Sequence, residues 1–298
     1  MNKKNAFLKV NVSADPNWLG GKSGMVRDFA SIVLRIETTN HCNFRCTFCP
    51  HPTHKRERLF INEELFNKIV REAGELGFRT LDIRNFGEPL VDKRLGKLVQ
   101  EARTYGFENI YIHTNGYGLT KKKLDYLVEC GMTMIIVSLS PRKEFEETRP
   151  GSKFDRLEMH LNSIRDSANR SKVYVDYIDT NSSSTEEVDD LKKWVADLGV
   201  NFRTEITLHN WAHGTLTGDI VRSPCHRLWT SFTVLSNGQV ALCCLDYEGE
   251  EVLGDLNLNG IEEIINGKRY QDIRLAHLDG EFLPICFNCD MPLVKDQK

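Results

Sequence analysis

Three cysteines stand close together in the segment Cys42-Asn43-Phe44-Arg45-Cys46-Thr47-Phe48-Cys49. This segment comes shortly after the apolar run Ile32-Val33-Leu34-Arg35-Ile36, which is typical of a buried strand. Three thiolates are one fewer than the four that close an ordinary zinc or iron–sulfur site. A [4Fe–4S] cluster bound by these three cysteines keeps one iron free for an outside ligand. A zinc site would instead need a fourth ligand, such as His41, His51 or His54.

Residues 31 to about 207 alternate between strand-like and helix-like runs. The predicted strands are Ile32–Glu37, Thr80–Arg84, Asn109–His113, Thr133–Leu139, Lys172–Ile178 and Phe202–Thr207. The predicted helices are Asn62–Leu76, Asp92–Tyr105, Thr120–Cys130, Phe154–Ala168 and Thr185–Leu198. This alternation predicts a parallel sheet with right-handed crossovers. Six strands suit either a partial (β/α)6 barrel or a doubly wound open sheet.

Local signals mark the ends of several predicted helices. Asn62 and Thr185 each precede two acidic residues, as N-cap residues do. Glycines follow the last turns of four helices, where a left-handed cap is expected. These glycines are Gly77, Gly106, Gly131 and Gly199.

Unusual polar residues follow the predicted strands. The three cysteines of residues 42–49 come after the first strand, Gly87-Glu88-Pro89 after the second and Thr114-Asn115-Gly116 after the third, while Ser138 and Ser140 close the fourth. In parallel α/β folds the functional residues gather at the carboxyl ends of the strands. The sequence therefore predicts a site at that edge of the sheet.

The character of the chain changes from about residue 208. A loop carrying His209 and His213 comes first, and Ser236-Asn237-Gly238 between apolar runs then predicts a hairpin. Leu256–Gly267 and Tyr270–Leu278 are predicted as short helical pieces. Four more cysteines can ligate either a [4Fe–4S] cluster or a zinc ion, and their spacing alone does not separate the two. They are Cys225, Cys243, Cys286 and Cys289, which leaves Cys130 and Cys244 spare.

Composition excludes several classes of function. The chain has 298 residues, of which 40% are hydrophobic and 27% charged, and a net charge of −3, so no basic surface for nucleic acid is expected. No apolar run approaches the roughly 20 residues of a membrane span. No apolar segment typical of a signal peptide follows Met1-Asn2-Lys3-Lys4. Nine cysteines in such a chain indicate metal or redox chemistry in the cytoplasm rather than disulfides.

The pattern Cys-x3-Cys-x2-Cys with an aromatic residue, Phe48, before the last cysteine resembles the hallmark of the radical S-adenosylmethionine (AdoMet) enzymes. The resemblance implies a partial (β/α)6 TIM-like barrel whose Cys42, Cys46 and Cys49 hold a [4Fe–4S] cluster with AdoMet at the open iron. It also implies that Gly87-Glu88-Pro89 holds the methionyl amino group of AdoMet, although Phe86 replaces the first of the family's two glycines. Further AdoMet contacts are implied for the Phe48 backbone at the adenine, and for Asn115, Ser138 and Arg149 at the ribose or carboxylate.

The second cysteine set resembles the short, single-cluster form of the SPASM domain, called Twitch. The resemblance implies that Cys225, Cys243, Cys286 and Cys289 ligate an auxiliary [4Fe–4S] cluster. It divides the chain into an N-terminal extension (1–30), the radical AdoMet barrel (31–207) and the Twitch domain (208–298). The layout is similar to that of the 2-deoxy-scyllo-inosamine dehydrogenases of butirosin biosynthesis. The arginine that is the candidate base in those enzymes is not present here, because this chain has Trp211 at the corresponding position.

The resemblance implies cleavage of AdoMet to a 5′-deoxyadenosyl radical and removal of a hydrogen atom from a small-molecule substrate. We expect oxidation of a secondary alcohol of a sugar or aminocyclitol, with an electron donor such as flavodoxin or ferredoxin. Epimerisation, peptide modification and a non-catalytic electron carrier are the alternatives. Residues 1–30 are few for a peptide-recognition domain, which favours the small molecule. The candidate catalytic residues are Cys244 as a hydrogen-atom donor and His209 and His213 as bases. Alternatively, both histidines are surface residues of a loop and have no catalytic role.

Overall fold

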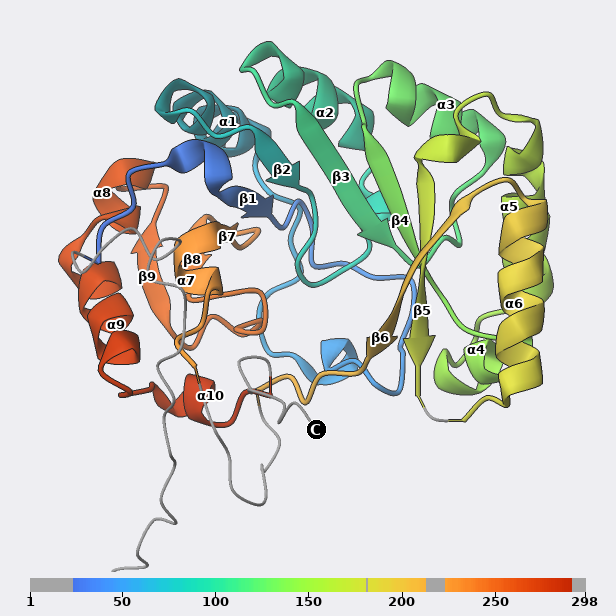
Figure 1. The fold of residues 1–298 in the computed structure, drawn as a ribbon. Coiled ribbons are helices and arrows are strands. Elements are labelled where there is room, and N and C mark those ends of the chain that lie inside the picture. The colour runs from blue at the N-terminus through green and yellow to red at the C-terminus, as the bar shows by residue number, and fades with distance from the viewer. Residues whose placement is uncertain (1–23, 181, 213–222, 291–298) are drawn as a thin grey trace, which may run out of the picture.

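The computed structural model describes residues 24–180, 182–212 and 223–290, and a nine-stranded sheet forms its centre (Figure 1). The strand order is β6-β5-β4-β3-β2-β1-β7-β8-β9. The first six strands are β1 (Val33–Ile36), β2 (Thr80–Asp82), β3 (Asn109–Thr114), β4 (Met134–Leu139), β5 (Val173–Asp179) and β6 (Asn201–Thr207). All six neighbouring pairs from β6 to β7 are parallel, so the six predicted strands form as expected.

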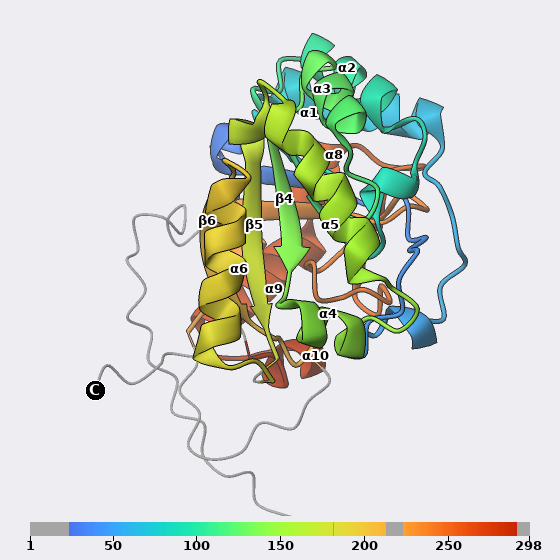
Figure 2. The ribbon, with the colours of Figure 1, turned by 90° about the vertical axis from the view of Figure 1, so that its right-hand side faces the viewer.

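The strand order decides between the two architectures that periodicity left open. In a doubly wound sheet the order reverses at a switch point, whereas β1 to β6 lie side by side in chain order. Right-handed crossovers between such strands place the helices on one side of the sheet, and the sheet curls into part of a barrel. Figures 1 and 2 show α5 and α6 on the outer side of β4 to β6. The partial (β/α)6 barrel is therefore confirmed.

The helices of the barrel cover the sheet with one apolar face each. They are α1 (Glu63–Leu76), α2 (Leu95–Thr104), α3 (Lys121–Glu129), α4 (Arg142–Thr148), α5 (Phe154–Ser163) and α6 (Thr185–Asp197). In α1 the buried residues Phe66, Ile69, Val70 and Ala73 recur at the spacing of one helix face. The short helix α4 was not predicted, because seven residues are too few for a clear period.

The helix ends follow the predicted caps with two corrections. The side chain of Asn62 accepts a hydrogen bond from the Leu65 amide (3.1 Å), and the four predicted cap glycines all have positive φ. For α6 the N-cap is Ser184 rather than Thr185, because Ser184 and Glu187 form a reciprocal capping box. The predicted helix Phe154–Ala168 ends at Ser163, where a 3₁₀ turn over Ile164–Asp166 takes over.

The C-terminal part extends the same sheet. The short helix α7 (Arg227–Thr230) leads into β7 (Ser231–Val234), which pairs with β1 and protects its edge. The hairpin to β8 (Gln239–Ala241) turns at Gly238 (φ 90°), as predicted, and β9 (Val252–Asp255) completes the sheet. Helices α8 (Ile261–Ile265), α9 (Lys268–Leu278) and α10 (Pro284–Phe287) follow. The predicted helical piece Leu256–Gly267 is thus much shorter than expected. No helix in the described part of the chain is long and apolar enough to span a membrane.

Candidate active site

A cavity of about 290 Å³ lies at the carboxyl ends of the barrel strands. Its lining includes ten of the residues singled out in the sequence: Cys42, Cys46, Phe48, Cys49, Gly87, Glu88, Asn115, Ser138, Arg149 and His209. They come from six separate parts of the chain. Pro89 lies outside the lining; it is buried and begins the 3₁₀ turn Pro89–Val91.

The three cysteines of residues 42–49 sit in a segment anchored on the barrel. The buried ring of Phe44 packs edge-on against Tyr117 (5.0 Å between centroids), and the Thr47 amide donates to the Thr148 carbonyl (2.8 Å). Burial raises the pKa of Cys42 and of Cys49 to about 12 and raises that of Cys46 as well. Thiolates here therefore need a cationic partner, which the irons of a cluster provide, so the site fits a metal cluster.

Glu88 is fully buried at the wall of the cavity and accepts three hydrogen bonds. They come from the Thr114 hydroxyl (2.6 Å), the Asn115 amide (2.7 Å) and the Leu90 amide (3.0 Å). A carboxylate offers about four acceptor positions, so one stays open. Burial raises the pKa of Glu88 to about 7, although the three hydrogen bonds lower it. An ammonium group in the cavity would donate to this open position and stabilise the charged form of Glu88.

Gly87 lets the backbone before Glu88 pass close to the segment that leads into the cysteines. Its φ is 152°, and a Cβ at this position would lie 2.5 Å from the Thr39 carbonyl oxygen and 2.9 Å from Asn40 Cα. The Glu88 amide donates to the His41 carbonyl (2.8 Å) at the same crossing. Only glycine permits this approach without displacing one of the two segments.

Arg149 presents an unsatisfied buried donor to the cavity. Its side chain is 2% exposed, and Nη1 donates to the Ser140 hydroxyl (3.2 Å) and the Thr148 hydroxyl (3.0 Å). Nη2 has no hydrogen-bond partner among the described residues. The guanidinium lies over the rings of Phe145 and Phe48. Burial lowers the pKa of Arg149 to about 10, so it stays charged near neutrality and fits a carboxylate.

Two of the remaining predicted AdoMet contacts, Asn115 and the Phe48 carbonyl, have partners within the protein. The Asn115 side chain donates to the Asn43 side chain (2.8 Å) and accepts from the Tyr117 amide (3.0 Å). The Phe48 carbonyl, expected at the adenine, accepts from the Trp211 indole nitrogen (2.9 Å). A carbonyl oxygen has a second lone pair, so this contact leaves room for one more donor. Trp211 itself has a φ of 54°, which is rare for a bulky residue.

The three candidate catalytic residues differ in their placement. His209 lines the cavity, and burial lowers its pKa, although Asp290 lies 3.9 Å from its Nδ1. His213 lies outside the described residues. Cys244 belongs to a turn after β8. Burial opposes its ionisation, but nearby arginines, Arg35 first, outweigh burial and lower the pKa of Cys244.

A second, apolar cavity brings together the four cysteines of the C-terminal part. Its lining includes Cys225, Cys243, Cys286, Cys289 and Arg227, and it leaves Cys244 out. Burial raises the pKa of the Cys225 thiol to about 11 and that of Cys243 well above its usual value. Within the described residues, no three His, Cys, Asp or Glu side chains are spaced to hold one metal ion.

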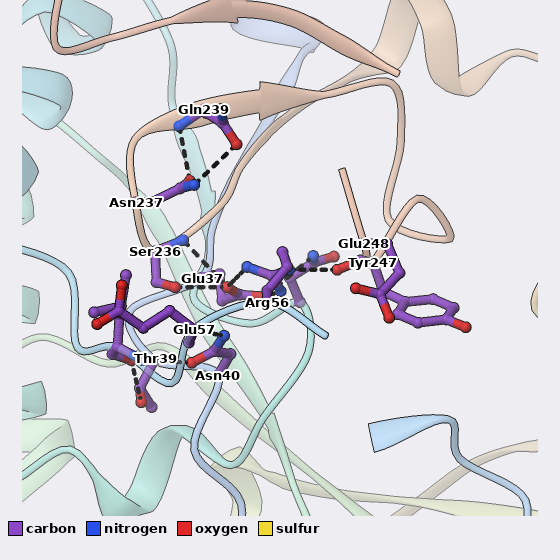
Figure 3. A network of polar contacts seen from close by, with 12 residues as sticks. Glu37, Thr39, Asn40, Arg56, Glu57, Ser236, Asn237, Gln239, Tyr247 and Glu248 are labelled. Carbon is purple, nitrogen blue, oxygen red and sulfur yellow. Dashed lines mark hydrogen bonds and ion pairs between the residues drawn. The ribbon is translucent and has the colours of Figure 1, made fainter. Parts of the chain in front are cut away.

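A polar network ties the two cysteine-bearing parts together (Figure 3). Glu37, at the end of β1, is fully buried and forms a two-pronged ion pair with Arg56 (2.7 and 2.8 Å). The Ser236 hydroxyl also donates to Glu37 (2.9 Å), and Arg56 donates to the Tyr247 carbonyl (2.5 Å). Tyr247 follows Cys243 by four residues and stacks on Phe86 (4.7 Å between centroids).

Sequence reasoning missed Arg84 and His113 as cavity residues. The sequence did contain a signal that polar groups meet inside the sheet, because charged residues interrupt strands that are otherwise apolar. They are Arg35 in β1, Asp82 in β2 and Asp176 in β5. All three are buried, so they face other polar groups and not solvent.

The comparisons agree with the architecture. The family model of the Radical SAM superfamily matches residues 36–210, and that of the SPASM iron–sulfur cluster-binding domain matches residues 225–290. A crystal structure of BtrN in complex with AdoMet and 2-DOIA has a TM-score of 0.63 at 20% identity, covering 89% of this chain and 94% of that chain. The structure of Streptococcus suis SuiB bound to precursor peptide SuiA has a TM-score of 0.65 at 16% identity. The match covers 82% of this chain and 66% of the SuiB chain.

Among curated proteins, the GTP 3′,8-cyclase of Desulforamulus reducens is 39% identical over 67 residues. That match spans only 21% of this chain and 20% of the cyclase. The two family models confirm the predicted cofactors, AdoMet with a [4Fe–4S] cluster and further iron–sulfur binding in the C-terminal part. Because the first model covers more than half of the chain, this protein belongs to the radical SAM superfamily, with a SPASM domain at its C-terminal end.

Proposed function

We propose that this radical SAM enzyme oxidises a secondary alcohol of a sugar or aminocyclitol to a carbonyl. The observation that carries the proposal is the pairing of two cavities. One combines three cysteines with Glu88 and Arg149, and the other combines four cysteines. The likeness to BtrN, whose structure holds AdoMet together with 2-DOIA, supports the same choice.

We assign the thiolates of Cys42, Cys46 and Cys49 to the first cluster. Glu88 accepts from the ammonium group of AdoMet through its open position, and Arg149 donates to the carboxylate through Nη2. When bound at a reduced cluster, AdoMet supplies a 5′-deoxyadenosyl radical that takes a hydrogen atom from the substrate carbon.

Conversion of an alcohol to a carbonyl removes a hydrogen atom, a proton and an electron. His209 is the proposed base for the hydroxyl proton, because its lowered pKa leaves it neutral near pH 7 and it lines the cavity. Cys225, Cys243, Cys286 and Cys289 would hold an auxiliary cluster, which would supply an acceptor for the electron. A flavodoxin or ferredoxin is the proposed donor of the electron that starts each turnover.

Two other outcomes have specific observations in their favour. An epimerase needs a hydrogen-atom donor, and Cys244 is a thiol among the arginines near both cavities. A peptide substrate agrees with the likeness to SuiB, which binds its precursor peptide, although this chain spans only 66% of SuiB. A simple electron carrier has no need for the Glu88 and Arg149 arrangement.

Metal content tests the two-cluster assignment. Anaerobically reconstituted protein should hold about eight irons per chain, from two four-iron clusters. Cys46→Ala should lower iron to about half and abolish formation of 5′-deoxyadenosine with dithionite, whereas the spare, buried Cys130 tolerates Ala as a control. Four irons with one zinc per chain would contradict the auxiliary cluster and remove the route for the electron.

Turnover in heavy water separates oxidation from epimerisation. With a panel of sugars and aminocyclitols, oxidation yields a carbonyl product, and Cys244→Ala keeps this activity. Replacement of both Cys286 and Cys289 with Ala should stop product formation after hydrogen-atom removal. Deuterium at a substrate C–H of the product, lost in Cys244→Ala, would instead establish epimerisation.

A further inference from the structure

We propose that the substrate alcohol also carries an oxyanion, either a carboxylate or a phosphate, and that Arg84 binds it. The inference rests on the proposed function, because Arg84 lines the cavity that contains the three cysteines of residues 42–49. It narrows the substrate class, since the ammonium group of an aminocyclitol would be repelled by this guanidinium.

The charges on the cavity wall leave Arg84 without a role in AdoMet binding. The lining contains three formally charged side chains, namely Arg84, Glu88 and Arg149. Glu88 and Arg149 match the ammonium and carboxylate of AdoMet. The two histidines of the lining, His113 and His209, are held neutral because burial lowers the pKa of each. One positive charge therefore faces the rest of the cavity.

The orientation of Arg84 suits an oxyanion. Its Nε donates to Asp82 Oδ2 (2.8 Å), which fixes the plane of the guanidinium. Its two Nη groups have no hydrogen-bond partner among the described residues, and the side chain is 34% exposed. A guanidinium with both Nη groups free binds a carboxylate or phosphate through two parallel hydrogen bonds.

The support behind Arg84 contains a second guanidinium group, that of Arg35, and the carboxylate of Asp82. Asp82 is fully buried, and its Oδ2 also accepts from Arg35 Nε (3.0 Å), so one carboxylate serves two guanidinium groups. Arg35 Nη1 and Asp82 Oδ1 lack hydrogen-bond partners in the described chain. Across the barrel, Asp176 is already paired with Arg203 (2.7 Å to Nε) and cannot neutralise this group. An incoming anion would balance the remaining charge.

Binding of simple anions to the reconstituted, AdoMet-saturated protein tests the inference. Titration calorimetry with potassium phosphate and potassium acetate is compared with potassium chloride at equal ionic strength. We expect saturable binding of at least one oxyanion, weakened at least tenfold in Arg84→Gln. Phosphate preferred over acetate indicates a phosphorylated substrate, and the reverse preference indicates a sugar acid. Arg84→Lys retains the positive charge but lacks the two parallel Nη donors, so its affinity for the anion should lie between those of the wild type and Arg84→Gln.

Arg71→Gln is the matched control, because Arg71 is exposed on α1 and its loss changes the net charge equally. Iron content and melting temperature show whether each variant is folded. If Arg84→Gln is not folded, the anion affinity of Arg84→Lys, compared with that of the wild type, tests the inference. Equal binding to wild type and Arg84→Gln, or no saturable binding to wild type, would overturn the inference. If the wild type binds the anion but forms no 5′-deoxyadenosine, this result would contradict the proposed function and not the anion site.

Discussion

At the scale of single residues, Glu88 shows how one side chain serves both the fold and the site. It caps its own 3₁₀ turn through the Leu90 amide and also connects β3 to that turn through Thr114 and Asn115. These bonds hold the carboxylate at the cavity wall without filling its last acceptor position. The structural role and the proposed binding role are therefore compatible.

Glu88→Gln should weaken AdoMet binding by about 1.5–3 kcal/mol, the scale of one hydrogen bond to a charged group. The pKa of Glu88 is raised to about 7 by burial, so below pH 7 the free protein must lose a proton before it can pair with the ammonium. The affinity of wild type should therefore rise between pH 6 and pH 7.5. Titration calorimetry at several pH values measures both effects.

Two comparisons make this prediction specific. Glu75→Gln, on the exposed face of α1, should leave both the affinity and its pH dependence unchanged. Glu88→Gln should lose the rise in affinity with pH, because the amide does not titrate. The same pH dependence in wild type and Glu88→Gln would show that Glu88 does not bind the ammonium.

At the scale of elements, the turn after β2 is shaped by Gly87. Gly87→Ala should lower the melting temperature and weaken AdoMet binding, because the new Cβ meets the Thr39 carbonyl and pushes Glu88 away. Gly77→Ala is the control, since Gly77 also has positive φ but has no atom within 4 Å of a Cβ. It should cost only the strain of a left-handed residue, about 1–2 kcal/mol, and leave AdoMet binding intact. Equal effects of the two variants on AdoMet binding would contradict this account of Gly87.

Elements also determine which polar residues reach the cavity. Arg35 and Asp82 lie in β1 and β2 and pair directly with each other, because the strands are neighbours in register. Arg84 extends this pair past the end of β2 to the cavity. Parallel neighbours thus bring charged side chains distant in sequence to one edge.

At the scale of the whole molecule, Glu37 and Arg56 form an ion pair and also contact the C-terminal part, Glu37 at Ser236 and Arg56 at the Tyr247 carbonyl (Figure 3). Arg56→Ala should destabilise the protein by about 3–5 kcal/mol, because it leaves the buried Glu37 carboxylate unpaired. Urea unfolding measures the loss. Glu37→Gln added to Arg56→Ala should recover part of the stability by removing the buried charge.

The surface pair of Arg269 and Glu251 provides the comparison, since Arg269 is 57% exposed. Arg269→Ala should cost less than about 1 kcal/mol, as exposed ion pairs do. If Arg56→Ala cost no more than Arg269→Ala, the network of Figure 3 would not contribute to holding the two cysteine-bearing parts together.

Much of the site was predictable because its signals are local. The spacing of Cys42, Cys46 and Cys49 and the position of Glu88 after a strand are properties of short segments. Arg84 was not predicted, since an arginine at the end of a predicted strand is usually solvated, and its proposed role depends on Asp82 and Arg35. Ser184 was missed as a cap because Thr185, its neighbour, carries the same kind of hydroxyl.

By itself the sequence determined the alternating strands and helices, the parallel α/β class and the two sets of cysteines, because hydrophobic periodicity and ligand spacing act over a few residues. Only the tertiary structure decided that β7 pairs with β1, that Ser236 donates to Glu37 across 199 residues, and that Arg84 borders the cavity. Such contacts depend on which edge of the sheet remains open and which buried charge lacks a partner. Both are properties of the folded chain as a whole.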